Sequence, residues 1–168
     1  AKSAIVGYDA RATSSKFANS IALGLNEAGV DVIEIGLCGT EEVYAATVEF
    51  GADVGLMVTA SHNPINYNGI KIIGPLARPL EVDSEFSKIA SIARAPLPVA
   101  PPKSKLGKRR SASMEARAIY LKKLIEIVKP NNLPAIRVGV DCGHGAVGPT
   151  LMALSMKLKS RGSKIEII

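Results

Sequence analysis

The stretch ADVGLMVTASHNPINYNGIKIIG, residues 52–74, contains two apolar runs that are separated by a loop rich in turn-forming residues. The first run, ADVGLMVTA, is apolar almost throughout, which is typical of a strand in a sheet covered on both faces. Asn68-Gly69 favours a tight reversal, and IKIIG then indicates a strand that returns beside its predecessor. The stretch therefore predicts a covered sheet with one reversed strand.

Upstream of this stretch, strand and helix patterns alternate. Apolar runs bounded by turns at 3–9 and 30–36 predict two more strands. The first helix is expected to bury Phe17, Ile21, Leu25 and Ala28. Helices are expected from a cap at Thr13 or Ser14 to Gly29, and from a cap at Thr40 to Gly51.

Downstream, the pattern is interrupted once and then resumes. Strand and helix alternation of this kind predicts an α/β fold: a three-layer α/β/α domain with a mixed sheet, followed by the beginning of a second similar domain. Further helices are expected at 82–93, 114–128 and 149–162, and further strands at 135–142 and 163–168. The expected division is a first domain at 1–96, a basic, proline-rich linker or loop at 97–112, and an incomplete second domain at 113–168.

The composition limits the kinds of protein that this chain can be. The net charge of +6 comes largely from KSKLGKRR at 103–110, and this segment leaves open a nucleic-acid-binding module. It contains no aromatic residue on which a base could stack, so nucleic acid is an unfavoured partner. Cys38 and Cys142 lack metal-site spacing and are expected to be small buried residues. No run is long enough to cross a membrane, and we expect a cytoplasmic protein.

The residues around Ser61 indicate a site for a phosphoryl group. Asn63 precedes Pro64 and is therefore biased away from helical backbone, so we expect extended chain in which Ser61 and His62 point to opposite sides. A serine–histidine hydrolase is for that reason disfavoured. A hydroxyl at the end of a buried strand, with Lys71 returning nearby, suits a phosphate. The alternative is a structural loop in which Ser61 and Asn63 bond only their own backbone.

Four segments carry a family resemblance. TASHNPINYNGIKI closely resembles the phosphoserine loop of the α-D-phosphohexomutases, which interconvert 1- and 6-phosphosugars. GTEEVYAATVEFGADVGLMVTASHNP extends the match and is most similar to the bacterial phosphomannomutase/phosphoglucomutase branch. VGYDARATS resembles the family's first strand and the turn after it, and VGVDCGHGAVGP resembles the opening of its second domain.

The resemblance implies a role for each candidate residue. Ser61 would carry the phosphoryl group and pass it to a hexose phosphate, so that a hexose 1,6-bisphosphate forms as intermediate and activator. His62 would support proton transfer, and Lys71 would balance phosphate charge. Arg11 is expected to support the structure first and to contact phosphate second, and Asn63 is a further candidate for substrate or phosphate binding. Gly143, Gly145 and Gly148 are interpreted as a plain strand-to-helix turn.

The chain also departs from the family pattern. The family binds Mg²⁺ through the phosphoserine together with an aspartate-rich DGDxDR loop, and no such loop occurs here. The family's sugar-recognition and phosphate-binding loops are likewise missing. The resemblance therefore implies the N-terminal part of a phosphomannomutase that acts on mannose phosphates, with glucose phosphates as further candidate substrates. Such a part needs the other domains of the same enzyme and is inactive alone. The alternatives are a phosphoglucosamine mutase, a nucleic-acid-binding module, and a regulatory remnant without activity.

Overall fold

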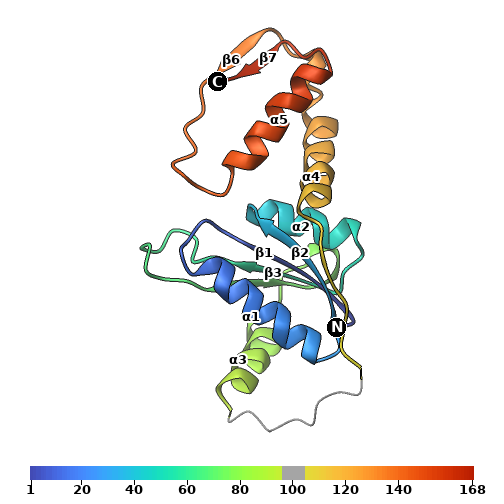
Figure 1. Ribbon diagram of the computed structural model, residues 1–168, viewed down its shortest axis with the longest axis vertical. Helices are drawn as coiled ribbons and strands as arrows, with labels where there is room; N and C mark the ends of the chain where they lie inside the picture. The colour runs from blue at the N-terminus through green and yellow to red at the C-terminus, as the bar shows by residue number, and fades with distance from the viewer. Residues whose placement is uncertain (96–104) are drawn as a thin grey trace.

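The computed structural model describes residues 1–95 and 105–168, and a five-stranded sheet forms the centre of the larger part (Figure 1). The strand order is β4-β3-β1-β2-β5. Four strands run parallel, whereas β4 is antiparallel to β3. The α/β fold with a mixed sheet is thus confirmed. The strands are β1 (Ser3–Tyr8), β2 (Asp31–Leu37), β3 (Val54–Val58), β4 (Ile70–Ile73) and β5 (Arg109–Ser111).

Helices cover both faces of this sheet. α1 (Ser14–Glu27) packs on one face against β1, β2 and β3. On the opposite face, α2 (Thr40–Glu49) and α4 (Ser113–Val128) contact each other and share an apolar cluster with β1 and β2. Between β4 and β5 lie a 3₁₀ turn (Pro75–Ala77), a π-helical turn (Val82–Phe86) and α3 (Ser87–Arg94). The first unit therefore has the expected three layers.

The buried face of α1 differs from the expected one. Ala18 and Ala22 are buried, whereas Phe17 is 44% exposed, so the contact runs along the alanines with Ile21 and Leu25 beside them. Small side chains allow a helix to lie close to the sheet, and the periodicity of large apolar residues could not show this preference. The predicted end of the helix is confirmed, because Gly29 has φ of 78°.

The basic segment belongs in part to the first sheet. Residues 96–104 lie outside the described residues, but β5 pairs in parallel with β2. Arg109 forms an ion pair with Glu34 at 2.8 Å, and Arg110 lies 5.0 Å from the centre of the Phe50 ring. The expectation of a linker or loop up to residue 112 is therefore wrong for 109–111, because acidic and aromatic partners from distant elements hold these cations. The start of α4 packs on the first unit through Ala116, whereas Leu124, Ile125 and Val128 near its end line a cavity with residues of the two strands and the helix that follow α4 in the chain.

The remaining residues form a small second unit. A 3₁₀ turn (Pro130–Asn132) leads from α4 into it, and β6 (Ile136–Val138) and β7 (Ile165–Ile167) pair in parallel beside α5 (Gly148–Ser160). Cys142 is only partly buried here, unlike Cys38, which is 1% exposed. No helix within 1–95 or 105–168 combines the length and apolarity needed to cross a membrane.

Candidate functional site

The loop from Thr59 to Gly69 connects β3 to β4 and projects past the end of the sheet (Figure 1). The Thr59 N–H donates to the Gly69 carbonyl at 2.9 Å, so the two chains remain paired just beyond the strands. The reversal is therefore made by the whole loop, and Asn68-Gly69 lies at its closing end rather than at its tip. This places the candidate site at the carboxyl end of β3, where parallel α/β sheets hold their ligands.

Ser61 has a left-handed backbone with φ of 54°. Its N–H donates to Thr59 Oγ1 at 2.9 Å, and its Oγ lies 3.0 Å from Nδ1 of His62. The expectation that the two side chains point apart is wrong, since it assumed extended backbone. A left-handed residue turns the chain, and the turn brings neighbouring side chains together. The exposed hydroxyl thus has a hydrogen-bonding base beside it.

Arg11, which follows β1 in the chain, holds the backbone of the loop. Its guanidinium donates to the carbonyl oxygens of Ser61, Asn63, Pro64 and Tyr67 at 2.6–3.1 Å. Its Nε lies 3.2 Å from Asp9 Oδ2. A guanidinium has five N–H groups, and these contacts use them all. Arg11 therefore supports the loop backbone, and in this conformation it has no N–H left for a phosphate.

Asp9 and Asn68 extend this support, although the sequence had not marked them as site residues. Asp9 Oδ1 accepts from Ser14 Oγ at 2.5 Å and from the Arg11 N–H at 3.1 Å. Asn68 Nδ2 donates to Ser14 Oγ at 2.8 Å, which ties the end of the loop to the start of α1. Burial alone would raise the pKa of Asp9, but hydrogen bonds from Ser14, Thr59 and Arg11 outweigh it and lower that pKa. The signal available in the sequence was VGYDARATS, which contains Asp9.

Asn63 and Lys71, the two other candidate residues, make fewer side-chain contacts with the loop. Asn63 Nδ2 donates to the Ala60 carbonyl at 2.8 Å, so its side chain closes the turn beside Ser61. Lys71 is exposed on β4, where it pairs with Met57 in the strand register. Within the described residues it makes no hydrogen bond or ion pair with the loop. Lys71 therefore has a side chain free to move, on the strand that leaves the loop.

The described residues supply no donor set for a metal ion. Within 1–95 and 105–168, no group of three or more His, Cys, Asp or Glu side chains could hold a metal ion. The glycine turn before α5 is closed by its own contacts, with the Gly143 N–H donating to Asp141 Oδ1 at 2.8 Å. The described residues thus do not fit a complete Mg²⁺ site, and a phosphate on Ser61 would be one ligand only.

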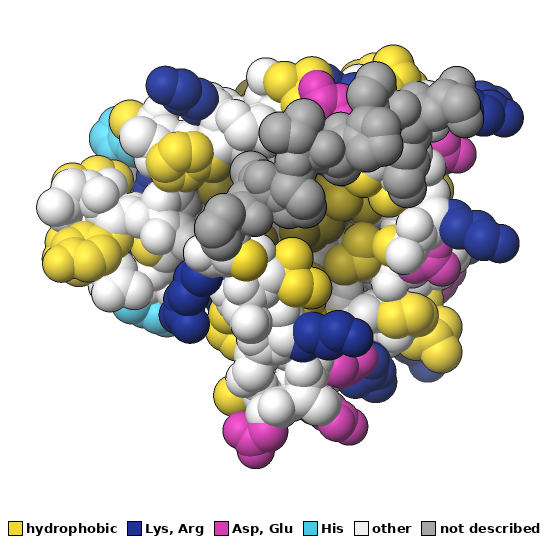
Figure 2. All heavy atoms as spheres, turned by 90° about the horizontal axis from the view of Figure 1, so that it is seen from below, with side chains coloured by type: hydrophobic (Ala, Val, Ile, Leu, Met, Phe, Trp, Pro, Cys, Tyr) yellow, Lys and Arg dark blue, Asp and Glu magenta, His cyan; other side chains and the backbone are white. Residues whose placement is uncertain are grey.

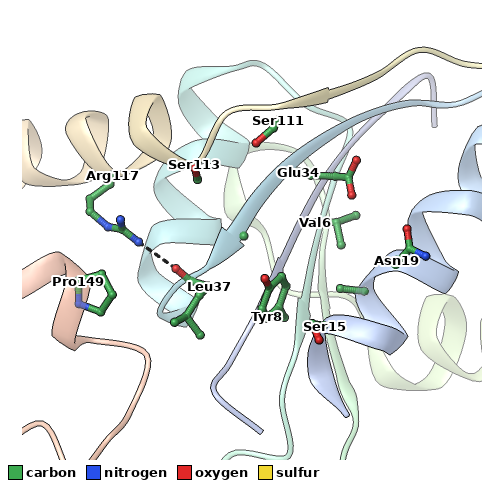
Figure 3. Close-up of a pocket in the computed structure, with 12 residues that line it drawn as sticks. Val6, Tyr8, Ser15, Asn19, Glu34, Leu37, Ser111, Ser113, Arg117 and Pro149 are labelled. Carbon is green, nitrogen blue, oxygen red and sulfur yellow. Dashed lines mark hydrogen bonds between the residues drawn. The ribbon is translucent and has the colours of Figure 1, made fainter. Parts of the chain in front are cut away.

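A cavity of about 580 Å³ lies apart from the loop, where the two units meet. Figure 3 shows Tyr8 and Leu37 at the ends of β1 and β2, with Arg117 from α4 and Pro149 from α5 on the opposite side. The Arg117 Nη2 donates to the Leu37 carbonyl at 2.9 Å. The second unit therefore completes one wall of this cavity.

Known proteins resemble the chain along nearly all of its length. The family described as phosphoglucomutase/phosphomannomutase, alpha/beta/alpha domain I, matches residues 1–96. The phosphomannomutase of Salmonella montevideo is 38% identical over 167 residues, and that of Escherichia coli K12 is 36% identical; each match covers 99% of this chain and 36% of the relative. The chain thus spans about a third of the length of these curated relatives.

Solved structures share the fold. The X-ray structure of a phosphoglucomutase/phosphomannomutase family protein from Burkholderia thailandensis matches 99% of this chain and 35% of its own, with a TM-score of 0.70 and 24% identity. A structure from Thermus thermophilus matches 98% of this chain and 36% of its own, with a TM-score of 0.73 and 23% identity. At these identities the likeness concerns the fold.

Proposed function

The chain belongs to the phosphoglucomutase/phosphomannomutase family, and from that membership we propose that it is the phosphoserine-bearing part of a phosphomannomutase. The full-length protein would interconvert mannose 6-phosphate and mannose 1-phosphate. The curated relatives named above, at 36–38% identity, support the choice of sugar. The contact between Ser61 and His62 carries the choice of residues.

The proposed reaction has two balanced transfers. In the first, the C1 hydroxyl oxygen of mannose 6-phosphate attacks the phosphorus on Ser61 and releases its proton to solvent, the bond from phosphorus to Ser61 Oγ breaks, and Ser61 Oγ takes up a proton. The product is mannose 1,6-bisphosphate. After the sugar has turned over, Ser61 Oγ gives up its proton and attacks the phosphorus at C6; the bond from phosphorus to O6 breaks, O6 takes up a proton, and mannose 1-phosphate leaves.

His62 serves the return transfer. Ser61 Oγ must lose a proton when it attacks, and His62 Nδ1 is 3.0 Å away, within reach to accept it. In the reverse direction, the same nitrogen would give the proton back. Arg11 fixes the backbone that carries Ser61, because phosphoryl transfer depends more on positioning and charge than on covalent help from the protein. Lys71 would add a positive charge to the transferring group.

Mg²⁺ would supply further charge neutralisation at the phosphate. The described residues lack its other ligands. The steps above therefore involve only residues of this chain, and none passes through the ion. We propose that these ligands, and the groups that recognise the sugar, come from further domains of the same protein. The same dependence would leave the 168-residue chain inactive by itself.

The nucleic-acid alternative loses support. Arg109 and Arg110 are engaged with Glu34 and Glu115 by ion pairs of 2.8 and 3.0 Å. On the face seen in Figure 2, the described Lys and Arg side chains are scattered among acidic and apolar ones. Nucleic-acid binding draws on clustered cations, so this face does not favour it.

A coupled assay on the full-length protein tests the proposal. Purified protein would be supplied with the 1-phosphates of mannose, glucose and glucosamine, Mg²⁺ and a hexose 1,6-bisphosphate. We expect turnover of mannose 1-phosphate with the highest kcat/KM, and none in Ser61→Ala. Preference for glucosamine 1-phosphate would instead identify a phosphoglucosamine mutase. Absence of turnover on all three sugars would contradict the mutase assignment.

A further inference from the structure

A buried polar network joins the two units. Thr150, in the first turn of α5, is 5% exposed, and Glu42, in the first turn of α2, is 3% exposed. The Thr150 hydroxyl donates to Glu42 Oε1 at 2.6 Å and accepts from Arg117 Nε at 3.1 Å. Arg117 Nε also lies 3.5 Å from Glu42 Oε2. One hydroxyl of the second unit thus completes an ion pair of the first.

The first unit holds its half of the network in place independently. Glu42 accepts the Gly39 N–H at 3.3 Å as part of the cap of α2, and Arg117 Nη2 donates to the Leu37 carbonyl at 2.9 Å. Both charged side chains are therefore fixed from elements of the first unit. The Thr150 hydroxyl therefore binds to an ion pair, Glu42 with Arg117, whose side chains are already held in place.

Because Glu42 is buried, its contact with Thr150 favours one orientation of α5 on the first unit. A carboxylate removed from water is costly unless hydrogen bonds and an opposite charge satisfy it. Oε1 already accepts the Gly39 N–H at 3.3 Å, and α5 adds a second, shorter donor only when it aims the Thr150 hydroxyl at this oxygen, at 2.6 Å. In the described part of the chain, two hydrogen bonds join α5 to the first unit, and both end on Thr150. Other orientations of α5 would cover the carboxylate without supplying this second donor.

We propose that Arg117 and Thr150 are positioning residues that lock the second unit onto the first in one orientation. The lock also shapes the cavity between the units, since Arg117 and Pro149, the neighbour of Thr150, form its wall (Figure 3). This inference does not depend on the mutase proposal. It concerns how α5 and the glycine turn before it are held relative to the ends of β1 and β2.

Distance measurements between the units test the lock. One spin label is placed at Lys16→Cys on α1 and one at Met152→Cys on α5, both exposed positions. Cys142 is replaced by serine. Cys38 stays, because burial raises the pKa of its thiol to about 12, which suppresses reaction with the label. Pulsed electron paramagnetic resonance then reports the distribution of distances between the labels.

The variants separate the lock from a general effect on α5. We expect a narrow distribution in the parent chain and in Thr150→Ser, which keeps the hydroxyl, and at least a doubling of its width in Thr150→Val and Arg117→Met. Ser155→Ala, on the same helix, should leave it narrow. If Arg117→Met fails to fold, Thr150→Val alone decides. A parent-like width in Thr150→Val, or a broad distribution in the parent or in Thr150→Ser, would overturn the proposal.

Discussion

Ser61 Oγ and Nδ1 of the adjacent His62 lie 3.0 Å apart, and the left-handed backbone of Ser61, with φ of 54°, makes this contact possible. A residue other than glycine rarely adopts this conformation, because its Cβ crowds the backbone. Such residues occur at functional sites where surrounding contacts hold them in place. Here those contacts are the bonds from Arg11 to the loop carbonyls and from the Ser61 N–H to Thr59.

Replacement of Ser61 by alanine should abolish turnover in the full-length protein while the fold is kept. The side chain is exposed, and its loss removes one hydroxyl and little packing, so the free energy of unfolding should change by less than ~0.5 kcal/mol. A coupled assay and urea unfolding give the two values. Normal turnover would remove Ser61 from the carrier role.

His62→Asn should slow the transfer of phosphate onto Ser61 by about 10²- to 10⁴-fold, the usual contribution of a positioned acid or base. Rapid mixing of full-length protein with a hexose 1,6-bisphosphate, followed by intact-protein mass measurement, gives the rate. His144→Asn is the matched control, since His144 lies in the second unit. Equal rates in the two variants would show that the contact with Ser61 has no chemical role.

Arg11→Lys should loosen the loop. Lysine keeps the charge but cannot donate to four carbonyl oxygens at once. We expect a loss of about 1.5–3 kcal/mol in the free energy of unfolding, the scale of hydrogen bonds from charged groups. Faster amide hydrogen exchange in the loop should accompany it. Arg94→Lys, on α3, is the control, and a loss no larger than in this control would contradict the supporting role.

Asp9 should make stability depend on pH at the acidic end. Its pKa is lowered below the ordinary 3.8 in the folded chain, so its ionised form stabilises the fold. This contribution is complete above the unfolded pKa and is lost as pH falls through the folded one. The difference in unfolding free energy between the parent and Asp9→Asn should therefore be constant from about pH 7 to about pH 5 and shrink below about pH 4. A difference that does not change down to about pH 3 would contradict this.

Lys71→Met keeps the apolar stem and removes the charge. If Lys71 reaches the transferring phosphate, transition-state stabilisation should fall by roughly 2.7–4 kcal/mol, or about a hundred- to thousand-fold in rate. Thermal stability should hardly change, because the side chain is exposed. Lys88→Met, on α3, controls for the loss of one surface charge. A rate within about threefold of the parent, under ~1 kcal/mol, would make Lys71 a surface charge only.

The fold class was readable from the sequence because strand and helix patterns alternate and Gly29 and Gly51 stop two helices. The expected caps were less accurate, since Gly39 rather than Thr40 caps α2 and Thr13 makes no capping bond at α1. The antiparallel β4 was readable as well, since the apolar runs on either side of the loop belong to neighbouring strands. The orientation of Ser61 toward His62 was not, because it depends on a left-handed residue held by Arg11, which lies 50 residues away in the chain. Local patterns carry no information about such a distant support.

The strand at 109–111 was not expected, for a similar reason. Proline and like charges suggested a solvated linker, yet the cations at 109 and 110 find acidic partners in β2 and in α4. A run of like charges is solvated only when no opposite charge meets it in the fold. Likewise, the supporting roles of Asp9 and Asn68 could not be predicted, because both side chains bond to Ser14 and Asn68 lies 54 residues from it in the chain.

The position of β5 also constrains how the chain folds during synthesis. β5 pairs with β2 although the two strands are far apart in the chain, with Val32 opposite Arg109. Until the ribosome has released residue 111, β2 remains an unpaired sheet edge, and α2 lacks the cover of α4 until residue 128. Exposed edges and apolar helix faces favour aggregation. A recombinant protein that stops at residue 96 would therefore retain both hazards permanently, whereas one extended through 128 would pair β2 with β5 and cover α2 with α4.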